Sequence, residues 1–318
     1  MELTNFFNMN PVVFYFFVIA ASLFIVAKSA DLLVYGISDY AKKLGISDYL
    51  VGFIIVSIGT ALPELIASMT GALVKQGGIV FGTILGSNIF KIPLLGVVIL
   101  IGRKIKINAN DVGNAPIITL FLTILPLFLI IDGILSRGDG IILLIAFLIY
   151  IARLWHGEGQ LGKMKKDVEL KNIYKDAIIF VGALAALLLS ARWLVFSSIG
   201  VSEVLNVSPY VIGLVVIGIG ASTPELMVQL RSVLKRKHDL AFGNVLGSIV
   251  ANSSLVLGLT SLISPFSMSI KTLFLTSIFM LGGILYVLIL MGKEEVNWKH
   301  GLLLISIYIL FLIFEGIF

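Results

Sequence analysis

The sequence predicts an all-α polytopic membrane protein, with ten transmembrane helices arranged as two inverted five-helix repeats. Three observations support this prediction: an apolar composition, ten apolar stretches of membrane-spanning length, and an internal repeat. Of the 318 residues, 58% are hydrophobic and only 13% are charged, and the mean hydropathy is +1.08. Soluble domains carry about 25% charged residues, so the composition excludes a soluble enzyme. Its abundance of large apolar residues also excludes a disordered chain.

Ten apolar stretches are long enough to be membrane helices, because a bilayer core of about 30 Å requires about 20 apolar residues per helix. They are residues 11–36, 49–74, 78–102, 114–132, 139–155, 173–200, 208–230, 240–264, 270–291 and 300–317. The longest polar insert, 156–172, is too short to fold as a nucleotide-binding domain. We therefore expect an N-terminal five-helix half over 1–156, a cytoplasmic linker over 157–172 and a C-terminal half over 173–318.

The basic residues predict the topology, since Lys and Arg gather in cytoplasmic loops. With ten spans, 17 of the 23 basic residues fall in the connections on one side of the membrane and three fall on the other side. The remaining three, Lys28, Lys91 and Arg192, lie within spans. This asymmetry predicts a multi-pass protein of the cell membrane whose two termini are extracellular.

An internal repeat becomes visible when the sequence is shifted by 161 residues, which aligns residues 29–95 with a second stretch without gaps. Pro63–Leu65 then matches Pro224–Leu226, and a Phe-Gly-x-x-Leu-Gly-Ser run occurs at both 81–87 and 242–248. Each half contains five predicted helices, so the second copy enters the membrane from the opposite side. Inverted repeats of this kind are common in secondary transporters, whose binding sites lie near the midplane between the halves.

Two polar segments, Gly59–Glu64 and Gly220–Glu225, interrupt the second and seventh predicted helices. Proline removes a backbone donor and disturbs the preceding helical turn, so carbonyl and hydroxyl oxygens near it become free to coordinate a cation. A Glu at the bilayer centre costs several kcal/mol unless it is paired or hydrated. The symmetric placement of Glu64 and Glu225 therefore predicts a buried cation site; the alternative is a packed proline kink with a protonated, hydrogen-bonded Glu.

The third and eighth predicted helices add polar groups at matching positions. Ser87 and Lys91 share one helix face, as do Ser248 and Asn252, because each pair is spaced i, i+4. The combined oxygen-rich set suits hard cations, especially Ca²⁺, which takes six to eight oxygen ligands. We expect the Lys91 ammonium to reach the cavity that holds the two glutamates and to act there as a tethered cation. The alternative is that Lys91 snorkels away along its helix.

These motifs resemble a known family. Gly-Thr-Ala-Leu-Pro-Glu at 59–64 and Gly-Ala-Ser-Thr-Pro-Glu at 220–225, each followed by Gly-x-x-x-Gly-Ser, resemble the two α-repeats of the cation/Ca²⁺ exchanger superfamily, most closely the prokaryotic Na⁺/Ca²⁺ exchangers. The resemblance implies antiport of Ca²⁺ against Na⁺, or against H⁺ in sister branches, at one central site. By motif position it places ten residues at that site: Ser57, Thr60, Glu64, Ser87, Lys91, Gly218, Ser222, Glu225, Ser248 and Asn252. Ser57 and Gly218 match positions that offer backbone carbonyls.

The sequence departs from the family pattern at four positions. Ala61 and Ala221 stand where the family commonly has Ser and Thr, Lys91 stands where it has Asn or Asp, and Asn252 stands where it often has Asp. With two Glu and one Lys, the site carries a formal charge of −1 when all three are ionised. An H⁺-coupled or monovalent-cation exchanger of the same fold is therefore an alternative to Ca²⁺/Na⁺ antiport.

Two other classes of protein are weighed against an antiporter. An intramembrane enzyme would need a membrane-embedded Asp pair, a Ser–His pair or a His-Glu-x-x-His motif, and the sequence has none of these. A cation channel would need a continuous pore, whereas inverted halves with broken helices favour alternating access. We therefore expect a monomeric secondary cation antiporter that is not an enzyme. It would use no cofactor, bind no nucleic acid or nucleotide, and have inorganic cations and the lipid bilayer as its partners.

Overall fold

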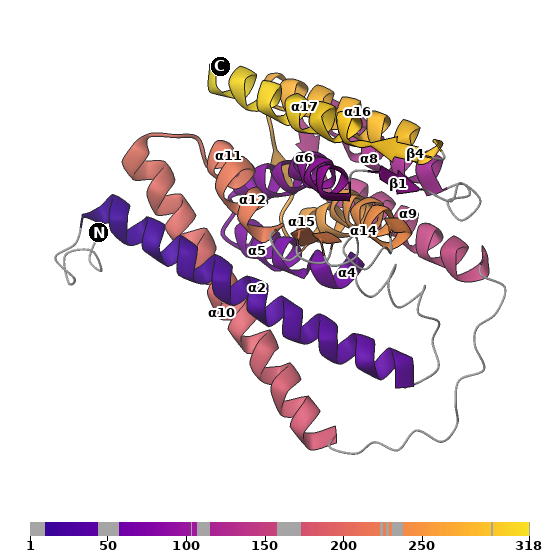
Figure 1. Ribbon diagram of the computed structural model, residues 1–318. Helices are drawn as coiled ribbons and strands as arrows, with labels where there is room; N and C mark the ends of the chain where they lie inside the picture. Colours follow the sequence, from indigo (N-terminus) through magenta and orange to yellow (C-terminus); the bar gives the residue numbers. More distant parts are fainter. Residues whose placement is uncertain are drawn as a thin grey trace.

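The computed structural model describes residues 10–43, 57–102, 104–106, 115–157, 173–222, 225–226, 229–230, 238–293 and 295–317. Over these residues the chain is a bundle of helices with four very short strands (Figure 1). Six of the described helices are long and apolar enough to cross a membrane: Pro11–Ser29, Gly77–Gly102, Val181–Leu205, Phe242–Ile263, Ile270–Met291 and Trp298–Gly316. Three shorter apolar helices are Leu62–Leu73, Ile117–Asp132 and Pro209–Ala221. The prediction of a helical, multi-span membrane protein is confirmed.

In the first half of the chain, helices occupy most of the described part of each predicted span. The elements are α2 (Pro11–Lys43), α4 (Ser57–Thr60), α5 (Leu62–Leu73), α6 (Gly77–Gly102), α8 (Ala115–Leu129), the 3₁₀ turn η2 (Ile130–Asp132) and α9 (Arg137–Gly157). The predicted span 49–74 is divided: residues 49–56 lie outside the described residues, and the remainder forms α4 and α5 with a break at Ala61. Residues 158–172, which hold most of the predicted linker, also lie outside the described residues.

The second half contains two π-helical segments that the sequence does not predict. Its elements are α10 (Ile173–Leu205), α11 (Pro209–Val211), η3 (Ile212–Ile217), α12 (Gly218–Ala221), α14 (His238–Val250), η4 (Ala251–Val256), α15 (Leu257–Ile263), α16 (Ile270–Met291) and α17 (Trp298–Ile317). The π-helical segments are η3 and η4. Such wide turns inside helices are rare and are frequently found at functional sites.

The sequence does not predict four short strands, which form two antiparallel ribbons in the otherwise helical structure. β1 (Lys104–Lys106) pairs with β4 (Glu295–Asn297), and β2 (Ile134–Leu135) pairs with β3 (Phe266–Ser267). Strands of two or three residues are too short to leave an alternating pattern in the sequence. Each of these strands lies next to the end of a helix. β3 precedes α16 and β4 follows it, so the two ribbons lie at opposite ends of that helix.

Each ribbon joins a strand from the first half to a strand from the second half, and the two ribbons are related by the internal repeat. A shift of 161 residues moves β1 onto the position of β3 and β2 onto the position of β4. The pairing of β1 with β4 thus becomes the pairing of β3 with β2.

Two helix crossings recur in the same way. At the crossing of α6 with α17, a Cβ on Gly301 would lie 2.6 Å from the carbonyl oxygen of Gly96. At the crossing of α9 with α15, a Cβ on Gly140 would lie 2.8 Å from the carbonyl oxygen of Gly258. The 161-residue shift takes Gly140 to Gly301 and takes Gly96 to the neighbour of Gly258. Glycine allows both backbone contacts, because any side chain would hold the helices apart.

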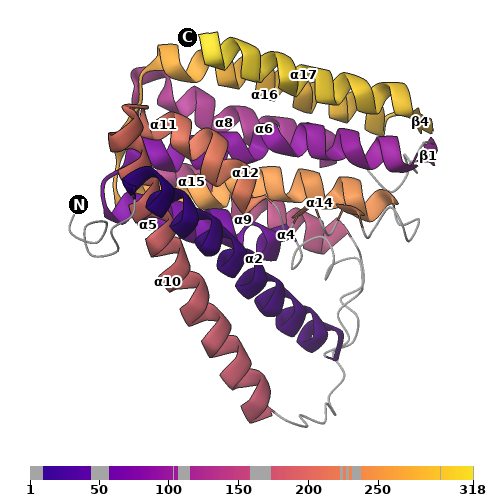
Figure 2. The same ribbon diagram turned by 60° about the vertical axis from the view of Figure 1, so that its left-hand side comes forward.

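The helices are arranged with α6 at the centre of the bundle, where most of its side chains are buried. α2 and α10 cross and pack against each other, and one end of each extends away from the other helices (Figure 1). The start of α2 and the end of α17 lie toward the same end of the bundle, opposite β1 and β4 (Figure 2).

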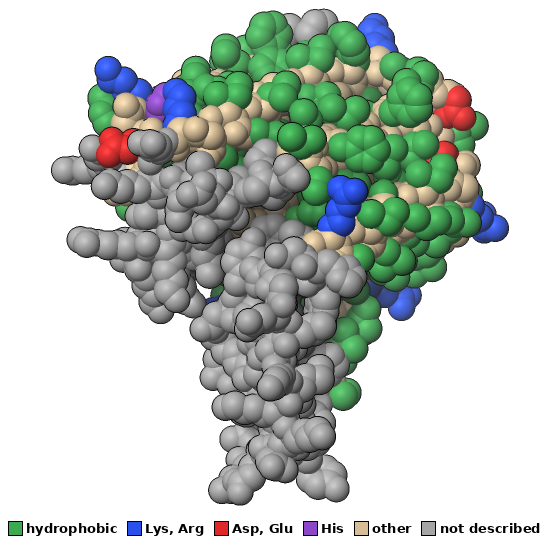
Figure 3. All heavy atoms as spheres, turned by 90° about the vertical axis from the view of Figure 1, so that its right-hand side faces the viewer, with side chains coloured by type: hydrophobic (Ala, Val, Ile, Leu, Met, Phe, Trp, Pro, Cys, Tyr) green, Lys and Arg blue, Asp and Glu red, His purple; other side chains and the backbone are tan. Residues whose placement is uncertain are grey.

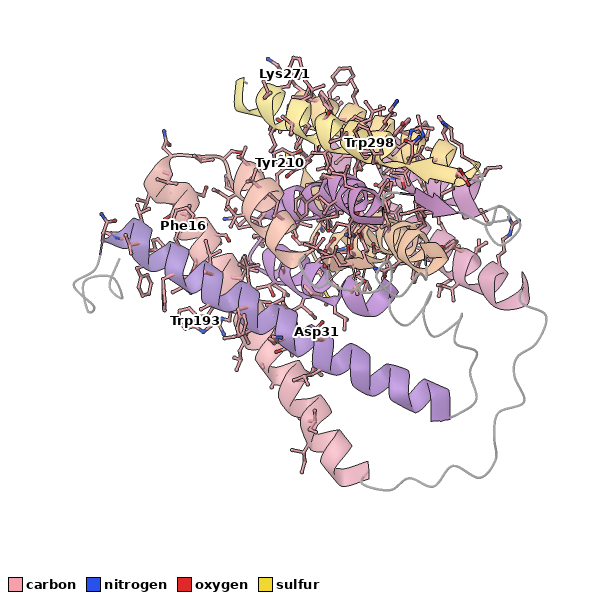
Figure 4. All side chains as sticks on the ribbon, viewed as in Figure 1. Phe16, Asp31, Trp193, Tyr210, Lys271 and Trp298 are labelled. Carbon is pink, nitrogen blue, oxygen red and sulfur yellow. The ribbon has the colours of Figure 1, made fainter. Side chains whose placement is uncertain are left out.

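The outer surface is apolar, as a lipid-facing surface must be. In Figure 3 the described part of one face is covered mainly by hydrophobic side chains, with only a few charged groups. Large residues such as Phe17 and Ile117 are 69% and 71% exposed. Trp298, at the first position of α17 beside β4, is also exposed (Figure 4). A Trp at a helix end matches the preference of its amphipathic ring for the membrane–water interface.

Candidate cation site

The first broken helix places Glu64 at the start of α5. α4 ends at Thr60, Ala61 forms the turn, and Pro63 occupies the first turn of α5 together with Glu64. The amide of Leu65 donates to the carbonyl of Ala61 at 2.9 Å and closes this turn. Glu64 is fully buried. A carboxylate in the first turn of a helix is stabilised by the free amide groups and the positive end of the helix dipole.

The second broken helix repeats this geometry. α12 ends at Ala221 and is followed by Ser222 in a turn, and the amide of Leu226 donates to the carbonyl of Ser222 at 3.2 Å. This bond is the counterpart, 161 residues later, of the bond between Leu65 and Ala61. Residues 223–224 lie outside the described residues, but Glu225 is described and is fully buried.

Two serine hydroxyls from different halves meet at the carboxylate of Glu64. Ser87, near the middle of α6, donates to Glu64 Oε1 at 2.7 Å, and its Oγ lies 2.8 Å from Ser222 Oγ. Ser222 Oγ also lies 3.3 Å from Glu64 Oε1 and 2.8 Å from the carbonyl oxygen of Gly218. These groups are all buried, and they form one connected polar cluster.

Close backbone packing brings the two serines together. A Cβ on Gly86 would lie 2.1 Å from the carbonyl oxygen of Leu214 in η3, and a Cβ on Gly218 would lie 2.8 Å from the amide nitrogen of Ser87. Side chains at these two glycines would therefore push α6 away from η3 and α12. The Gly-Ser pair of the repeated motif thus has two roles, close packing at Gly86 and polar contact at Ser87.

Lys91 lies one turn after Ser87 on α6 and forms an ion pair inside the bundle. Its Nζ is 3.3 Å from Oε1 of Glu225, and both side chains have zero exposed surface. The expectation that the ammonium reaches the glutamates is confirmed, and the alternative that Lys91 snorkels away along its helix is wrong. The structure also shows which glutamate is its partner, which the sequence does not indicate.

Amide hydrogen bonds add two residues to the site, Asn88 and Ser253. Neither was expected there from the sequence. Asn252 donates from Nδ2 to Ser87 Oγ and to Asn88 Oδ1, both at 3.2 Å, and Asn88 donates from Nδ2 to Ser253 Oγ at 3.0 Å. Asn252 and Ser253 are consecutive residues of the π-helical segment η4, and both contact α6. The signal for Asn88 in the sequence is an amide next to Ser87 within a mostly apolar helix.

The other expected site residues are buried nearby or lie partly outside the description. Thr60 Oγ1 donates to Asn244 Oδ1 at 3.4 Å, and Ser248 Oγ donates to the carbonyl oxygen of Val245 at 3.0 Å. The carbonyl of Gly218 accepts from Ser222. The backbone of Ser57 is part of α4, but its side chain lies outside the described residues.

The cluster has more hydrogen-bond acceptors than donors. Each serine hydroxyl carries one proton, so Ser222 can donate to only one of the three oxygens within its reach. Oε2 of Glu64, both carboxylate oxygens of Glu225 and Oδ1 of Asn252 accept no hydrogen bond from the described residues. No group of three His, Asp or Glu side chains suited to a metal occurs in the described part of the chain. A cation at this site would therefore be held by two carboxylates at most, together with neutral oxygens.

The family of the chain follows from its match to a family model, which the geometry of the site supports. A model of the sodium/calcium exchanger protein family matches residues 14–156 and 175–316. The chain belongs to this family. It is a membrane protein of the prokaryotic cation/Ca²⁺ exchanger type, and its relatives are transporters rather than enzymes.

Individual relatives agree with this assignment. Inner membrane protein YrbG of Escherichia coli is 33% identical over 258 residues, which cover 76% of this chain and 78% of that protein. The sodium/calcium exchanger MaX1 of Methanosarcina acetivorans is 28% identical over an alignment that covers 94% of this chain and 97% of that protein. A solved structure of the sodium-calcium exchanger NCX_Mj superposes with a TM-score of 0.68 at 24% identity, and it covers 95% of this exchanger and 97% of that chain. This exchanger therefore has the fold of NCX_Mj.

Proposed function

We propose that this protein is a secondary active antiporter that exchanges Ca²⁺ for Na⁺ by alternating access, with Glu64 and Glu225 at the midplane site. The observation that carries the proposal is the position of Glu64. Its carboxylate is buried and is linked to a hydroxyl from each half, yet one of its oxygens has no donor among the described residues.

A surplus of buried acceptors is what a cation site requires. An unsatisfied buried acceptor costs about 1–3 kcal/mol, and a charged one costs more. A bound cation removes this cost by contacting several oxygens at once. Carboxylate, hydroxyl and amide oxygens are the ligands preferred by hard cations such as Ca²⁺, and Na⁺ is also a hard cation.

The repeated contacts support two inverted five-helix repeats, with the site between them. Both ribbons, both glycine crossings and the turns that precede Leu65 and Leu226 recur at the same 161-residue shift. The two stretches that match the family model are separated near the expected linker 157–172. We propose halves over 1–156 and 173–318, ten membrane helices and extracellular termini, in a monomer that uses no cofactor.

Two alternatives are tested together with the proposal. An exchanger of monovalent cations or an H⁺-coupled exchanger of the same fold is favoured by the ion pair of Lys91 with Glu225, because this pair reduces the negative charge of the site. A cation channel is disfavoured, because both glutamates have no exposed surface and therefore line no open pore.

Transport into proteoliposomes tests the proposal directly. We expect ⁴⁵Ca²⁺ uptake that is driven by an outward Na⁺ gradient and that saturates with Ca²⁺, whereas an outward K⁺ or H⁺ gradient alone gives no uptake. Glu64→Gln and Glu225→Gln should each abolish this uptake. Glu203→Gln, at an exposed position on α10, is the matched control and should transport like the wild type.

Each other outcome has a distinct meaning. Uptake that needs no ion on the opposite side would indicate a channel, and uptake driven only by H⁺ would indicate the H⁺-coupled alternative. Near wild-type uptake by both glutamine variants at positions 64 and 225 would reject the site itself.

A further inference from the structure

We propose that Lys91 is a resident cation of the transport site, which holds Glu225 and leaves Glu64 as the carboxylate that binds the transported ion. The inference rests on the proposed function, since it assumes that the Glu64–Glu225 region is where cations bind. It adds a charge balance: one monovalent cation neutralises the site, whereas Ca²⁺ leaves it with an excess positive charge.

The burial of Lys91 is the first reason for this assignment. Among the Lys and Arg side chains that the structure describes, only Lys91 is buried. An ammonium in this position cannot be solvated by water, so it depends on a carboxylate partner for its stability. Glu225 Oε1, at 3.3 Å, is that partner.

The charges around the site give the second reason. Glu64 faces the cluster from α5, Glu225 from the segment after α12, and Lys91 from α6, while the remaining groups of the cluster are neutral hydroxyls and amides. The formal sum is −1. With this sum, the site with one bound Na⁺ is neutral and the site with one bound Ca²⁺ carries +1. Uncompensated charge in a low-dielectric interior is strongly unfavourable, so the charge balance favours the state with one Na⁺.

The two carboxylates are used differently, which is the third reason. Oε1 of Glu225 already contacts an ammonium, so the negative charge of Glu225 is balanced. Among the described residues, Glu64 Oε1 accepts hydrogen bonds from the neutral hydroxyls of Ser87 and Ser222, and no described Lys or Arg forms an ion pair with this carboxylate. Glu64 is therefore the carboxylate whose charge requires a mobile cation.

The internal repeat supplies the natural replacement for testing Lys91. The position that corresponds to Lys91 in the second half is Asn252, a neutral amide that donates to Ser87. Lys91→Asn thus installs the residue of one half in the other half. It removes one positive charge and makes the formal charge of the site more negative, from −1 to −2.

Equilibrium binding of ⁴⁵Ca²⁺ and ²²Na⁺ to the purified protein in detergent measures this effect. We expect Lys91→Asn to increase Ca²⁺ affinity by about tenfold or more, because a like charge close to a bound cation weakens its binding. The number of Na⁺ ions bound should rise by one. Lys271→Asn, at an exposed position at the start of α16 (Figure 4), removes a lysine outside the site and should change neither quantity.

A double variant provides a second test that does not depend on the single one. Glu225→Gln alone leaves the Lys91 ammonium unpaired beside Glu64, so it should abolish Na⁺ binding. Glu225→Gln combined with Lys91→Asn returns the charge of the site to −1, and we expect it to restore binding of one Na⁺ at Glu64. Size-exclusion profiles of each variant show which proteins are folded.

The outcomes separate the two proposals. If folded Lys91→Asn protein binds Ca²⁺ and Na⁺ as the wild type does, or if the folded double variant binds no Na⁺, Lys91 is not a resident cation. Loss of binding in Glu64→Gln would still support the proposed function in that case. If instead the wild type and Glu64→Gln bind cations equally, the proposed site itself is wrong.

Discussion

The close approach of α6 to η3 makes a quantitative prediction for Gly86→Ala. The added Cβ would lie 2.1 Å from the carbonyl oxygen of Leu214 and 2.7 Å from its carbonyl carbon. Real Cβ atoms do not approach other atoms closer than 3.0 Å, so the two backbones must separate by about 1 Å. Ser87 is the next residue, and its 2.8 Å contact with Ser222 Oγ would then exceed hydrogen-bonding distance.

We therefore expect Gly86→Ala to lose both stability and cation binding. Overpacking of a tight contact costs about 1–3 kcal/mol, and separation of the serines removes part of the ligand set. The assay is thermal unfolding of the purified protein in detergent, with and without Na⁺ or Ca²⁺. Gly86→Ala should unfold at a lower temperature than the wild type, and added cation should no longer raise that temperature.

The control for this experiment is Gly282→Ala on α16. A Cβ at Gly282 meets no atom within 4 Å, and alanine favours the helix by about 1 kcal/mol relative to glycine. Gly282→Ala should therefore be as stable as the wild type or more stable, with its cation response intact. If Gly86→Ala behaves like Gly282→Ala, the close packing of α6 against η3 does not position the site.

Two further predictions concern other parts of the chain. Asn88→Ala should destabilise the protein by about 1–3 kcal/mol, because it leaves the buried groups of Asn252 and Ser253 without partners; an unchanged unfolding temperature would contradict this. A cysteine introduced at Gly159, in a chain with none of its own, should react with a membrane-impermeant thiol reagent only after the cells are permeabilised. Reaction in intact cells would contradict the proposed topology.

Much of the cluster could be predicted from the sequence, because the repeat constrains it. Two Pro-Glu pairs at one offset identify the broken helices, and the i, i+4 spacing places Ser87 and Lys91 on one face. The structure brings Glu64, Ser87, Ser222 and Asn252 into one hydrogen-bonded cluster. Their role in binding a cation stays a prediction.

Other features depend on contacts between distant segments and leave no local pattern. The π-helical segment η4 changes the direction of the side chains that follow Val250, so helical spacing alone does not predict that Asn252 and Ser253 both contact α6. The choice of Glu225 rather than Glu64 as the partner of Lys91 is likewise set by the position of α6 between the two broken helices. The ribbons arise only when strands from opposite halves meet.

The pairing of strands across the halves bears on how the chain is assembled during synthesis. β1 emerges from the ribosome about two hundred residues before its partner β4, and Gly96 of α6 emerges about two hundred residues before Gly301. Until the last helix is inserted, a strand edge and a glycine-lined helix surface of the first half have no partner. Contacts between residues so distant in sequence form slowly, and exposed strand edges promote misassembly. Removal of α17 should therefore leave a chain that is inserted in the membrane but is readily captured by quality-control proteases.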